Sequence, residues 1–462
     1  MGCGSSAPAV DSNIVDDETA SPLNKDEFSK TPHLLVDGVC SCDVAQGELG
    51  DCWFLSACAA IARDKQMMSR VMRDIIDIDM TAEDYSGKLT FHFWRFGQWK
   101  TVTIDDLLPS KNSKLLFSSC ENPDEFWLPL LEKAYAKLHG TYEALEGGFE
   151  MDGMVDLTGG LAEIYMVAGQ PMSIDTEKLY FKRLYRAMEN GAFLTCGRTG
   201  MRPEIADGLV NGHAYTITNV AFVQVADRVE PFRLLRIRNP WASSMEWNGD
   251  WSDTDQERWS KVSDEVRARI GYKSVNDDGE FWMAFEDFRR EFSTFSICTL
   301  GPDLNDDLWT DDPQKTKIHY MYGEWRGSSA GGATESSNPH SSNPQYLISI
   351  AQPDDDDPDG DLSVVIALMQ MYRRKNITSM VEFRSIGFRI YKQTEKDRKI
   401  TEEEVDSPLE GSGMYLPIRE VTGRFEMKPG SYILIPSTAN AGEDNKFMLR
   451  FYAAKPLIFQ EI

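Results

Sequence analysis

The sequence predicts an α+β protein that ends in an all-β domain, and three observations support this class. Apolar helix formers are concentrated early in the chain, over residues 52–62 and 128–138. Short runs rich in β-branched and aromatic residues dominate the later part. An acidic segment with two prolines, residues 301–313, separates the C-terminal third from the rest. Two folded parts joined by a linker are therefore expected.

The individual elements follow from local patterns. Residues 52–62 are apolar on nearly every face, which is typical of a buried helix, and Asp51 is a suitable N-cap. Gly159-Gly160 marks a boundary that divides the first part into two lobes, residues 31–158 and 159–300. The second lobe and the C-terminal domain, residues 314–462, should be rich in strands, which we expect over residues 214–220, 232–237, 346–350, 363–369, 387–391, 431–436 and 447–452.

Length, charge and cysteine usage narrow the class of protein. A chain of 462 residues is too long for a single small binding module. The 48 basic and 74 acidic residues give a net charge of -26, which argues against a nucleic-acid partner. Eight cysteines without a secretory signal predict reduced thiols and a cytoplasmic protein, and no apolar run reaches the length of a membrane span.

The N-terminal residues 1–30 predict a flexible arm that carries an acylation signal. Residues 1–6 match the pattern for acylation of Gly2 after removal of Met1, and Cys3 is placed to carry a second acyl chain. Two chains would hold the protein at the inner face of a membrane, whereas one chain binds only marginally. The alternative is a flexible, unmodified start.

Three polar residues far apart in the chain have the chemistry of a thiol protease. Cys52 opens the predicted helix, where the helix dipole lowers the pKa of a thiol. His213 follows a glycine-rich loop and opens a predicted strand, and Asn239 follows another strand. Each has a plain structural alternative: an inert buried cysteine, a structural histidine and an Asn-Pro turn. The order Cys, His, Asn nevertheless occurs in papain-like proteases.

The segments around these residues resemble the active-site signatures of the calpains, a family of calcium-dependent, papain-like cysteine proteases. The similar segments are residues 46–55, 212–215 and 238–241, with further similarity at 126–127, 131–137, 142–145, 278–282 and 429–432. The resemblance covers roughly residues 34–460. It implies a two-lobed papain-like protease core followed by a C2-like β-sandwich domain, and limited proteolysis of protein substrates through a thioester.

The resemblance also assigns roles to individual residues. Cys52 is implied as the nucleophile, His213 as the general base and then acid, and Asn239 as the amide that orients it. The side-chain amide of Gln46 and the main-chain N–H of Cys52 would stabilise the oxyanion. Trp241 would shield the bond between His213 and Asn239 from water.

Calcium is the implied cofactor, with one site in each lobe. For the first lobe the resemblance implies the carboxylates of Asp43 and Glu125 and the carbonyls of Val36 and Gly38. For the second lobe it implies the side chains or carbonyls of Glu246, Asp253, Asn276, Asp278 and Glu280. Glu246 fits least well, because the segment before it is one residue longer than the family spacing and has Ala242 in place of Gly.

The acidic run at residues 354–361 has the start of an EF-hand loop but has Ile366 where the bidentate glutamate is required. It resembles instead the acidic loop of the calpain sandwich domain, which leaves weak calcium binding, contact with basic residues and a solvated charge run as alternatives. The sequence shows no penta-EF-hand domain, so pairing with the small subunit of conventional calpains is not expected.

Three other functions are weaker interpretations. Residues 327–331 match the G-x-S-x-G motif of serine hydrolases but lack its strand-to-helix context. Cys40, Cys42 and His33 have poor spacing for structural zinc. A calcium- or membrane-responsive interaction scaffold that keeps the calpain fold, with little or no proteolysis, remains the main alternative.

Overall fold

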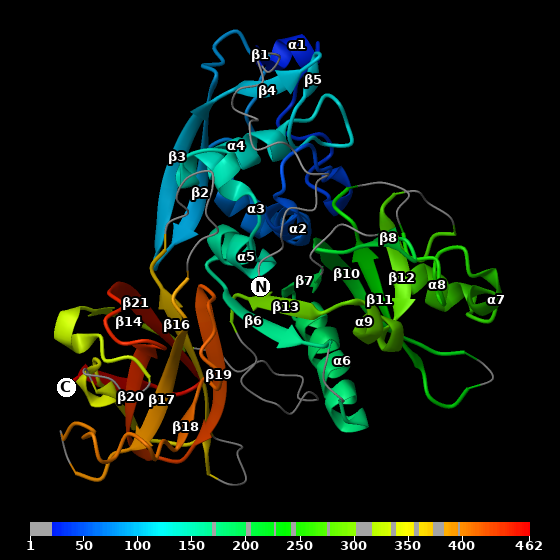
Figure 1. Cartoon of the computed structure of the whole chain (residues 1–462). Coiled ribbons are helices and arrows are strands. Elements are labelled where there is room, and N and C mark those ends of the chain that lie inside the picture. The colour runs from blue at the N-terminus through cyan, green and yellow to red at the C-terminus, as the bar shows by residue number, and fades with distance from the viewer. Residues whose placement is uncertain are drawn as a thin grey trace. The chain divides into compact units, whose positions relative to one another are not determined.

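The computed structural model describes residues 21–168, 172–199, 205–225, 228–241, 246–274, 278–301, 317–333, 339–354, 360–372, 383–395 and 398–462. These residues form two compact units, of which the first ends at Thr299 and the second begins at Leu300, apart from the short segment Phe96–Gln98, which groups with the second. Figure 1 labels the elements along the chain. The predicted linker falls almost entirely outside the described residues.

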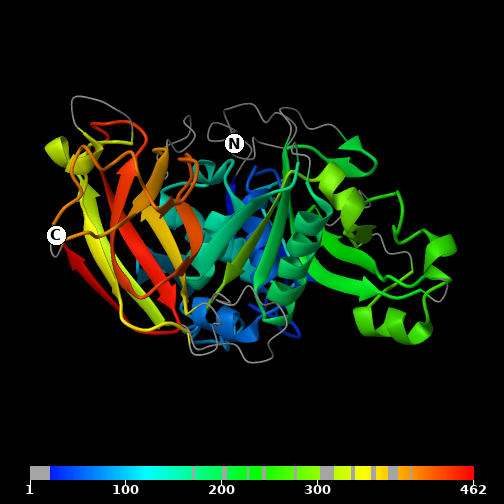
Figure 2. The ribbon, with the colours of Figure 1, turned by 90° about the horizontal axis from the view of Figure 1, so that it is seen from below.

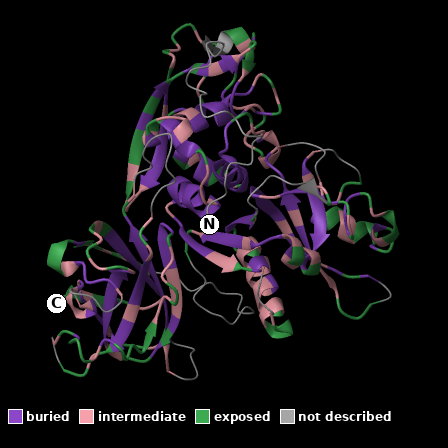
Figure 3. Cartoon of the chain, viewed as in Figure 1, coloured by how far each residue is buried: buried purple, intermediate pink, exposed green. Residues whose placement is uncertain are grey.

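The first half of the first unit is built around helices. Its elements are β1 (Ser21–Asn24), α1 (Lys25–Phe28), η2 (Ser41–Asp43), α2 (Cys52–Ile61), α3 (Lys65–Val71), β2 (Lys88–Arg95), β3 (Gln98–Asp105), β4 (Leu107–Lys111), β5 (Lys114–Leu115), α4 (Trp127–His139), η3 (Glu143–Leu145) and α5 (Glu150–Thr158). Every residue of α2 is buried, as predicted, so this helix forms the centre of the first lobe (Figure 3).

The structure of residues 21–28 differs from the sequence-based expectation. The sequence places them in a flexible arm, but β1 pairs with β4 in antiparallel register, from Ser21 opposite Ser110 to Asn24 opposite Leu107, and α1 follows directly. The pairing supplies main-chain hydrogen bonds that a scan for apolar periodicity does not detect.

The second half of this unit is a six-stranded antiparallel sheet with helices on it. The sheet order is β12-β11-β10-β7-β13-β6. Its strands are β6 (Leu161–Met166), β7 (Phe193–Arg198), β10 (His213–Val223), β11 (Phe232–Arg238), β12 (Glu280–Ala284) and β13 (Thr294–Thr299), accompanied by the β8 (Ile205–Ala206) and β9 (Leu209–Val210) pair and by α6 (Ile174–Glu189), α7 (Gln256–Trp259), α8 (Asp264–Ile270) and α9 (Phe285–Glu291). Figure 2 shows α6 lying along the sheet.

Aromatic and aliphatic side chains form the core beneath α6. Phe181 and Leu184 of α6 are fully buried and pack with Tyr215 and Leu235 of the sheet and with Phe295 of β13. On the other side of the sheet, α5 lies between α2 and strands β6, β7 and β13. This packing fixes α2 against the strand that begins at His213.

The second unit is an all-β sandwich of two antiparallel sheets. Their orders are β14-β21-β16-β19 and β18-β17-β20-β15-β22. The strands are β14 (Lys317–Trp325), β15 (Tyr346–Ile350), β16 (Leu362–Gln370), β17 (Ile386–Lys392), β18 (Glu410–Gly411), β19 (Glu420–Met427), β20 (Gly430–Thr438), β21 (Asn445–Ala453) and β22 (Leu457–Glu461). The fold class predicted from the sequence is confirmed.

Candidate active site

Cys52 occupies the first position of α2 and is almost completely buried, with 1% of its surface exposed. Asp51 is the N-cap residue, but its side chain makes no capping hydrogen bond. Instead, the carboxyl group of Glu132 in α4 is hydrogen-bonded to it. The thiol therefore lies at the N-terminus of a buried helix, where the helix dipole favours negative charge.

His213 and Asn239 meet across the sheet. His213 opens β10 and Asn239 directly follows β11, and these two strands pair with each other. His213 Nε2 lies 2.8 Å from Asn239 Oδ1, and both residues are buried. Because an amide oxygen only accepts hydrogen bonds, Nε2 carries the proton and Nδ1 is left as the basic atom.

Trp241 lies beside this pair. Its ring centroid is 4.8 Å from that of His213, and its main-chain N–H donates to Asn239 Oδ1 over 3.0 Å. The indole covers an imidazole that is already buried. Burial lowers the pKa of His213 to about 4, and the hydrogen bond with Asn239 only partly offsets this effect. The imidazole is therefore neutral at pH 7 in this arrangement, the form that can accept a proton.

Hydrogen bonds of main-chain and side-chain groups connect the segment around Cys52 with the segments around His213 and Asn239. Thr216 Oγ1 in β10 donates to the carbonyl of Ser56 in α2 over 2.8 Å. The main-chain N–H of Gln46 donates to the carbonyl of Pro240, the residue after Asn239, over 3.0 Å. Residues that are far apart in the sequence are in this way brought to one region between the two lobes.

The Gln46 side chain lies on the turn that leads to Cys52. Its Nε2 donates to the carbonyl of Leu49 over 2.7 Å, which uses one of its two N–H groups. Gly47 is pressed against the carbonyl of Phe117 so closely that a Cβ would lie 2.0 Å from that oxygen. Only glycine fits at this point, so the turn that carries Gln46 is held in one position.

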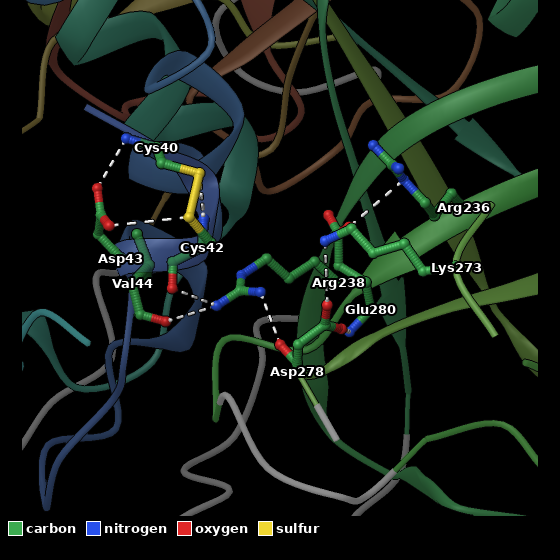
Figure 4. Close-up of a disulfide and its surroundings, with 9 residues drawn as sticks. All are labelled: Cys40, Cys42, Asp43, Val44, Arg236, Arg238, Lys273, Asp278 and Glu280. Carbon is green, nitrogen blue, oxygen red and sulfur yellow. Dashed lines mark hydrogen bonds and ion pairs between the residues drawn. A yellow bond between two sulfur atoms is a disulfide. The ribbon is translucent and has the colours of Figure 1, made fainter. Parts of the chain in front are cut away.

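Arg238 is a residue whose position the sequence does not single out. Its guanidinium donates to the carbonyls of Cys42 and Val44 in the first lobe, over 2.9 and 3.3 Å, and to the carbonyl of Asp278 over 2.8 Å (Figure 4). It directly precedes Asn239 and joins the loops that carry both predicted metal sites. Its place before Asn239 in the motif is the available signal in the sequence.

Figure 4 also shows a correction to the expected thiol chemistry. Cys40 and Cys42 are joined in a disulfide, although the sequence predicts reduced thiols. The turn of η2 brings these two side chains together, and the Cys40 N–H donates to Asp43 Oδ2 over 2.7 Å. The five free cysteines among the described residues, Cys52, Cys58, Cys120, Cys196 and Cys298, are all buried.

The first predicted metal set is close together. The main-chain N–H of Val36 donates to Glu125 Oε1 over 2.8 Å. The pKa of Glu125 is raised to about 7, mainly by burial and in part by the charges of Asp43 and Asp37. Gly38 follows Asp37 in the same loop, with both residues in the left-handed region. Mutually repelling carboxylates beside loop carbonyls fit a hard cation such as calcium.

The second predicted set also gathers acidic oxygens. The pKa of Asp253 is raised to about 7, mainly by burial and in part by the charges of Asp278 and Glu280. Its Oδ1 is buried without a hydrogen bond. Glu246 Oε1 accepts from the Gly279 N–H over 2.9 Å. This arrangement fits a cation. Asn276 lies outside the described residues, as does Ala242.

Side chains alone do not complete either set. Across the described ranges, no three His, Cys, Asp or Glu side chains gather closely enough to hold a metal by themselves. Main-chain carbonyls, as the sequence predicts for Val36 and Gly38, would have to complete the coordination.

The remaining motifs have no strand-to-helix or helix-loop-helix context where the structure describes them. Gly327–Ser329 forms a 3-10 turn after β14 and not a nucleophile elbow. Asp354 and Asp361 both precede β16, and the Asp354 N–H donates to the Asp361 carbonyl over 2.8 Å, while residues 355–359 of the acidic run lie outside the described part. Gly2 and Cys3 also lie outside it. Among the described residues, no helix is long and apolar enough to cross a membrane.

Comparison with known proteins identifies the family of both units. Residues 13–299 match the calpain family cysteine protease model, and residues 321–452 match the model of calpain large subunit, domain III. Calpain-B of Drosophila melanogaster is 36% identical over 444 residues, which cover 93% of this chain and 47% of that protein. Calpain clp-1 of Caenorhabditis elegans is 37% identical over 442 residues, which cover 93% and 55%. The human calpain-2 catalytic subunit is 36% identical over 452 residues, covering 94% and 62%.

His213 and Asn239 are paired, and the strand that begins with His213 packs against the helix that begins with Cys52, an arrangement that resembles that of papain-like cysteine proteases. The chain belongs to the calpain family of cysteine proteases. It spans about half to three fifths of the length of the curated relatives named above.

Proposed function

We propose that this chain is a calcium-dependent cysteine endopeptidase that carries out limited proteolysis of proteins. The hydrogen bond between His213 Nε2 and Asn239 Oδ1 is the main support, because it leaves Nδ1 unprotonated beside the helix that begins with Cys52. The predicted lobes, residues 31–158 and 159–300, and the sandwich domain, residues 314–462, are kept in this proposal as the units that carry it.

The proposed chemistry uses this chain's own groups. His213 Nδ1 takes the thiol proton of Cys52, and Sγ attacks the carbonyl carbon of the scissile peptide bond. The oxyanion accepts hydrogen bonds from the Cys52 N–H and from the second N–H of Gln46 Nε2. His213 then protonates the leaving amine, which leaves a thioester on Sγ. A water molecule that gives its proton to His213 attacks the thioester, and the acid product leaves as the thiol is restored.

Calcium would be held by Asp43, Glu125 and the carbonyls of Val36 and Gly38 in one lobe, and by Glu246, Asp253, Asp278 and Glu280, with Asn276, in the other. When bound, it supplies positive charge that neutralises these carboxylates and fixes their loops. Arg238 donates hydrogen bonds to the carbonyls of Cys42 and Val44 in one loop and of Asp278 in the other. Ordering of either loop by calcium would therefore help to fix the position of the neighbouring Asn239.

The decisive experiment is a calcium titration of casein cleavage by the wild-type protein and by Cys52→Ala. We expect cleavage that rises with calcium in the wild type and is at least about 10³-fold slower in the variant. Cys58→Ala, which removes another buried thiol of α2, is the matched control and should retain cleavage. Persistent cleavage by Cys52→Ala would reject the assigned nucleophile, and inactivity of the wild type at millimolar calcium would favour the scaffold alternative.

Membrane attachment is a separate part of the proposal and rests on the sequence of residues 1–6 alone. Acyl chains on Gly2 and Cys3 would place the enzyme at a membrane. Gly2→Ala, expressed in eukaryotic cells, should move from the membrane fraction to the soluble fraction. The same distribution in the wild type and the variant would remove this part of the proposal without affecting the protease assignment.

A further inference from the structure

Glu150 carries a buried carboxylate that lacks a compensating charge among the residues the structure describes. It is the first residue of α5 and is 5% exposed, and its Oε1 is buried without a hydrogen-bond partner. Its pKa is raised to about 7, mainly by burial and in part by the charge of Asp152, against the opposing effect of its own main-chain N–H. Burying such a group costs free energy unless something neutralises it.

Two other buried acids of the same unit, Glu132 and Asp156, have side-chain partners that Glu150 lacks. Glu132 accepts hydrogen bonds from the main-chain N–H and the hydroxyl of Ser118. Asp156, one turn further along α5 than Asp152, pairs with Arg95 over 2.6 Å and accepts from the Tyr135 hydroxyl over 2.9 Å. These two acids have the partners expected of structural carboxylates. Glu150 therefore calls for a different explanation.

On one side, the Glu150 segment adjoins the segment of Cys52. The main-chain N–H of Gly147 donates to the carbonyl of Gly50 over 2.9 Å, two residues before the thiol. Gly153, one turn into α5, packs so tightly on α2 that a Cβ there would lie 2.9 Å from that of Ala57. The N-terminus of α5 is thus held close to the N-terminus of α2.

On the other side, Glu150 reaches the strand next to His213. A Cβ on Gly197 would lie 3.0 Å from Glu150 Oε1 and 3.0 Å from the hydroxyl of Thr294, so glycine leaves room for the carboxylate. Gly197 in β7 is the cross-strand partner of Ala214, which follows His213 in β10. The carboxylate thus lies between the strand of the proposed base and the helix of the proposed nucleophile.

We propose that Glu150 forms a cation-binding subsite that accepts the basic side chain of a substrate residue flanking the scissile bond, lysine or arginine, with Asp152 adding to its negative potential. This inference rests on the proposed function, since it concerns the selectivity of that site. A bound ammonium or guanidinium group supplies the charge and hydrogen bonds that Oε1 lacks. A hydrogen bond to a charged group contributes enough free energy for about tenfold selectivity or more.

The test uses full-length protein in calcium and sets of fluorogenic peptides that carry lysine, acetyl-lysine or norleucine at one position flanking the scissile bond. We expect kcat/KM to favour lysine by about tenfold over both neutral side chains at one position, and this ratio to fall to about one in Glu150→Gln. Glu163→Gln, which changes a buried carboxylate in the second lobe, should keep the wild-type ratio. A wild type without preference for lysine at any position overturns the inference, whether or not Glu150→Gln folds.

A binding measurement separates this inference from the protease assignment. Fluorescence anisotropy of labelled peptides with Cys52→Ala needs no turnover, and Kd should favour lysine by about tenfold, with loss of the preference in Cys52→Ala/Glu150→Gln. Equal Kd values for the three peptides would overturn the subsite. Wild-type protein that binds with this preference but cleaves no peptide would reject the proposed function and leave the subsite supported.

Discussion

Replacement of His213 by alanine is expected to lower kcat/KM on a peptide substrate by about 10⁴-fold, because the variant lacks both the base for Cys52 and the acid for the leaving amine. Asn239→Ala should cost less, since the imidazole stays in place and loses only the partner that fixes Nε2 as the protonated atom. Steady-state kinetics with one peptide at saturating calcium compares the two variants.

His319→Ala, in strand β14 of the sandwich unit, is the matched control and should leave kcat/KM within about twofold of the wild type. Iodoacetamide reacts with the thiolate form of cysteine, and Cys52 should be a thiolate at pH 7 only if His213 takes its proton. The rate of alkylation of Cys52 should therefore also fall in His213→Ala. Unchanged kinetics and alkylation in that variant would reject the proposed base.

His213 should also make the free energy of unfolding depend on pH, and His213→Ala tests this. The pKa of His213 is lowered to about 4 in the folded protein, whereas an unfolded histidine titrates near 6.5. Between these values the unfolded chain binds a proton that the folded chain does not, so stability falls as the pH decreases from about 6.5 to about 4, by roughly 3 kcal/mol in total. His213→Ala should lose this dependence in urea unfolding with chelator present, and His319→Ala should keep it.

Sequence patterns predict the elements of this protein where apolar runs are continuous. The predicted helix at residues 52–62 corresponds to α2 (Cys52–Ile61), and the predicted strand at 346–350 matches β15. The 16-residue helix α6 is not among the predicted elements, because its apolar residues are interrupted by charged ones and form no continuous run. In the structure Phe181 and Leu184, with the partly buried Tyr180, Tyr185 and Met188, form a face that packs on the sheet.

The candidate site divides in the same way between local and tertiary information. The motifs around Cys52, His213 and Asn239 can be recognised in the sequence, and the structure adds the hydrogen bond that selects the tautomer. The role proposed for Glu150 could not be predicted from the sequence. It depends on Oε1 being buried without a hydrogen-bond partner, and nothing in the sequence distinguishes this glutamate from the other acidic residues, 74 in all. The Cys40–Cys42 bond likewise depends on the turn between them.

Replacement of Arg450 by methionine is expected to destabilise the sandwich unit by about 3–5 kcal/mol. Arg450 of β21 and Glu420 of β19 lie on either side of β16 and are almost completely buried, at 0% and 1% side-chain exposure. The guanidinium donates from Nε to Glu420 Oε1 over 2.7 Å and from a second nitrogen to Oε2. Without it, a carboxylate remains buried without its counter-charge, which costs much more than the lost packing.

Hydrogen exchange measured on peptides that cover β16 and β21 reports on the sandwich unit independently of the first unit. The free energy of opening of these strands should fall by about 3–5 kcal/mol in Arg450→Met. The double variant Arg450→Met/Glu420→Leu should recover most of the loss, because it removes the stranded charge together with its partner. Arg326→Met, which breaks the exposed pair with Glu324 at 3.8 Å, should change it by less than about 0.5 kcal/mol. A double variant as unstable as Arg450→Met would mean that packing, and not the uncompensated charge, determines the loss.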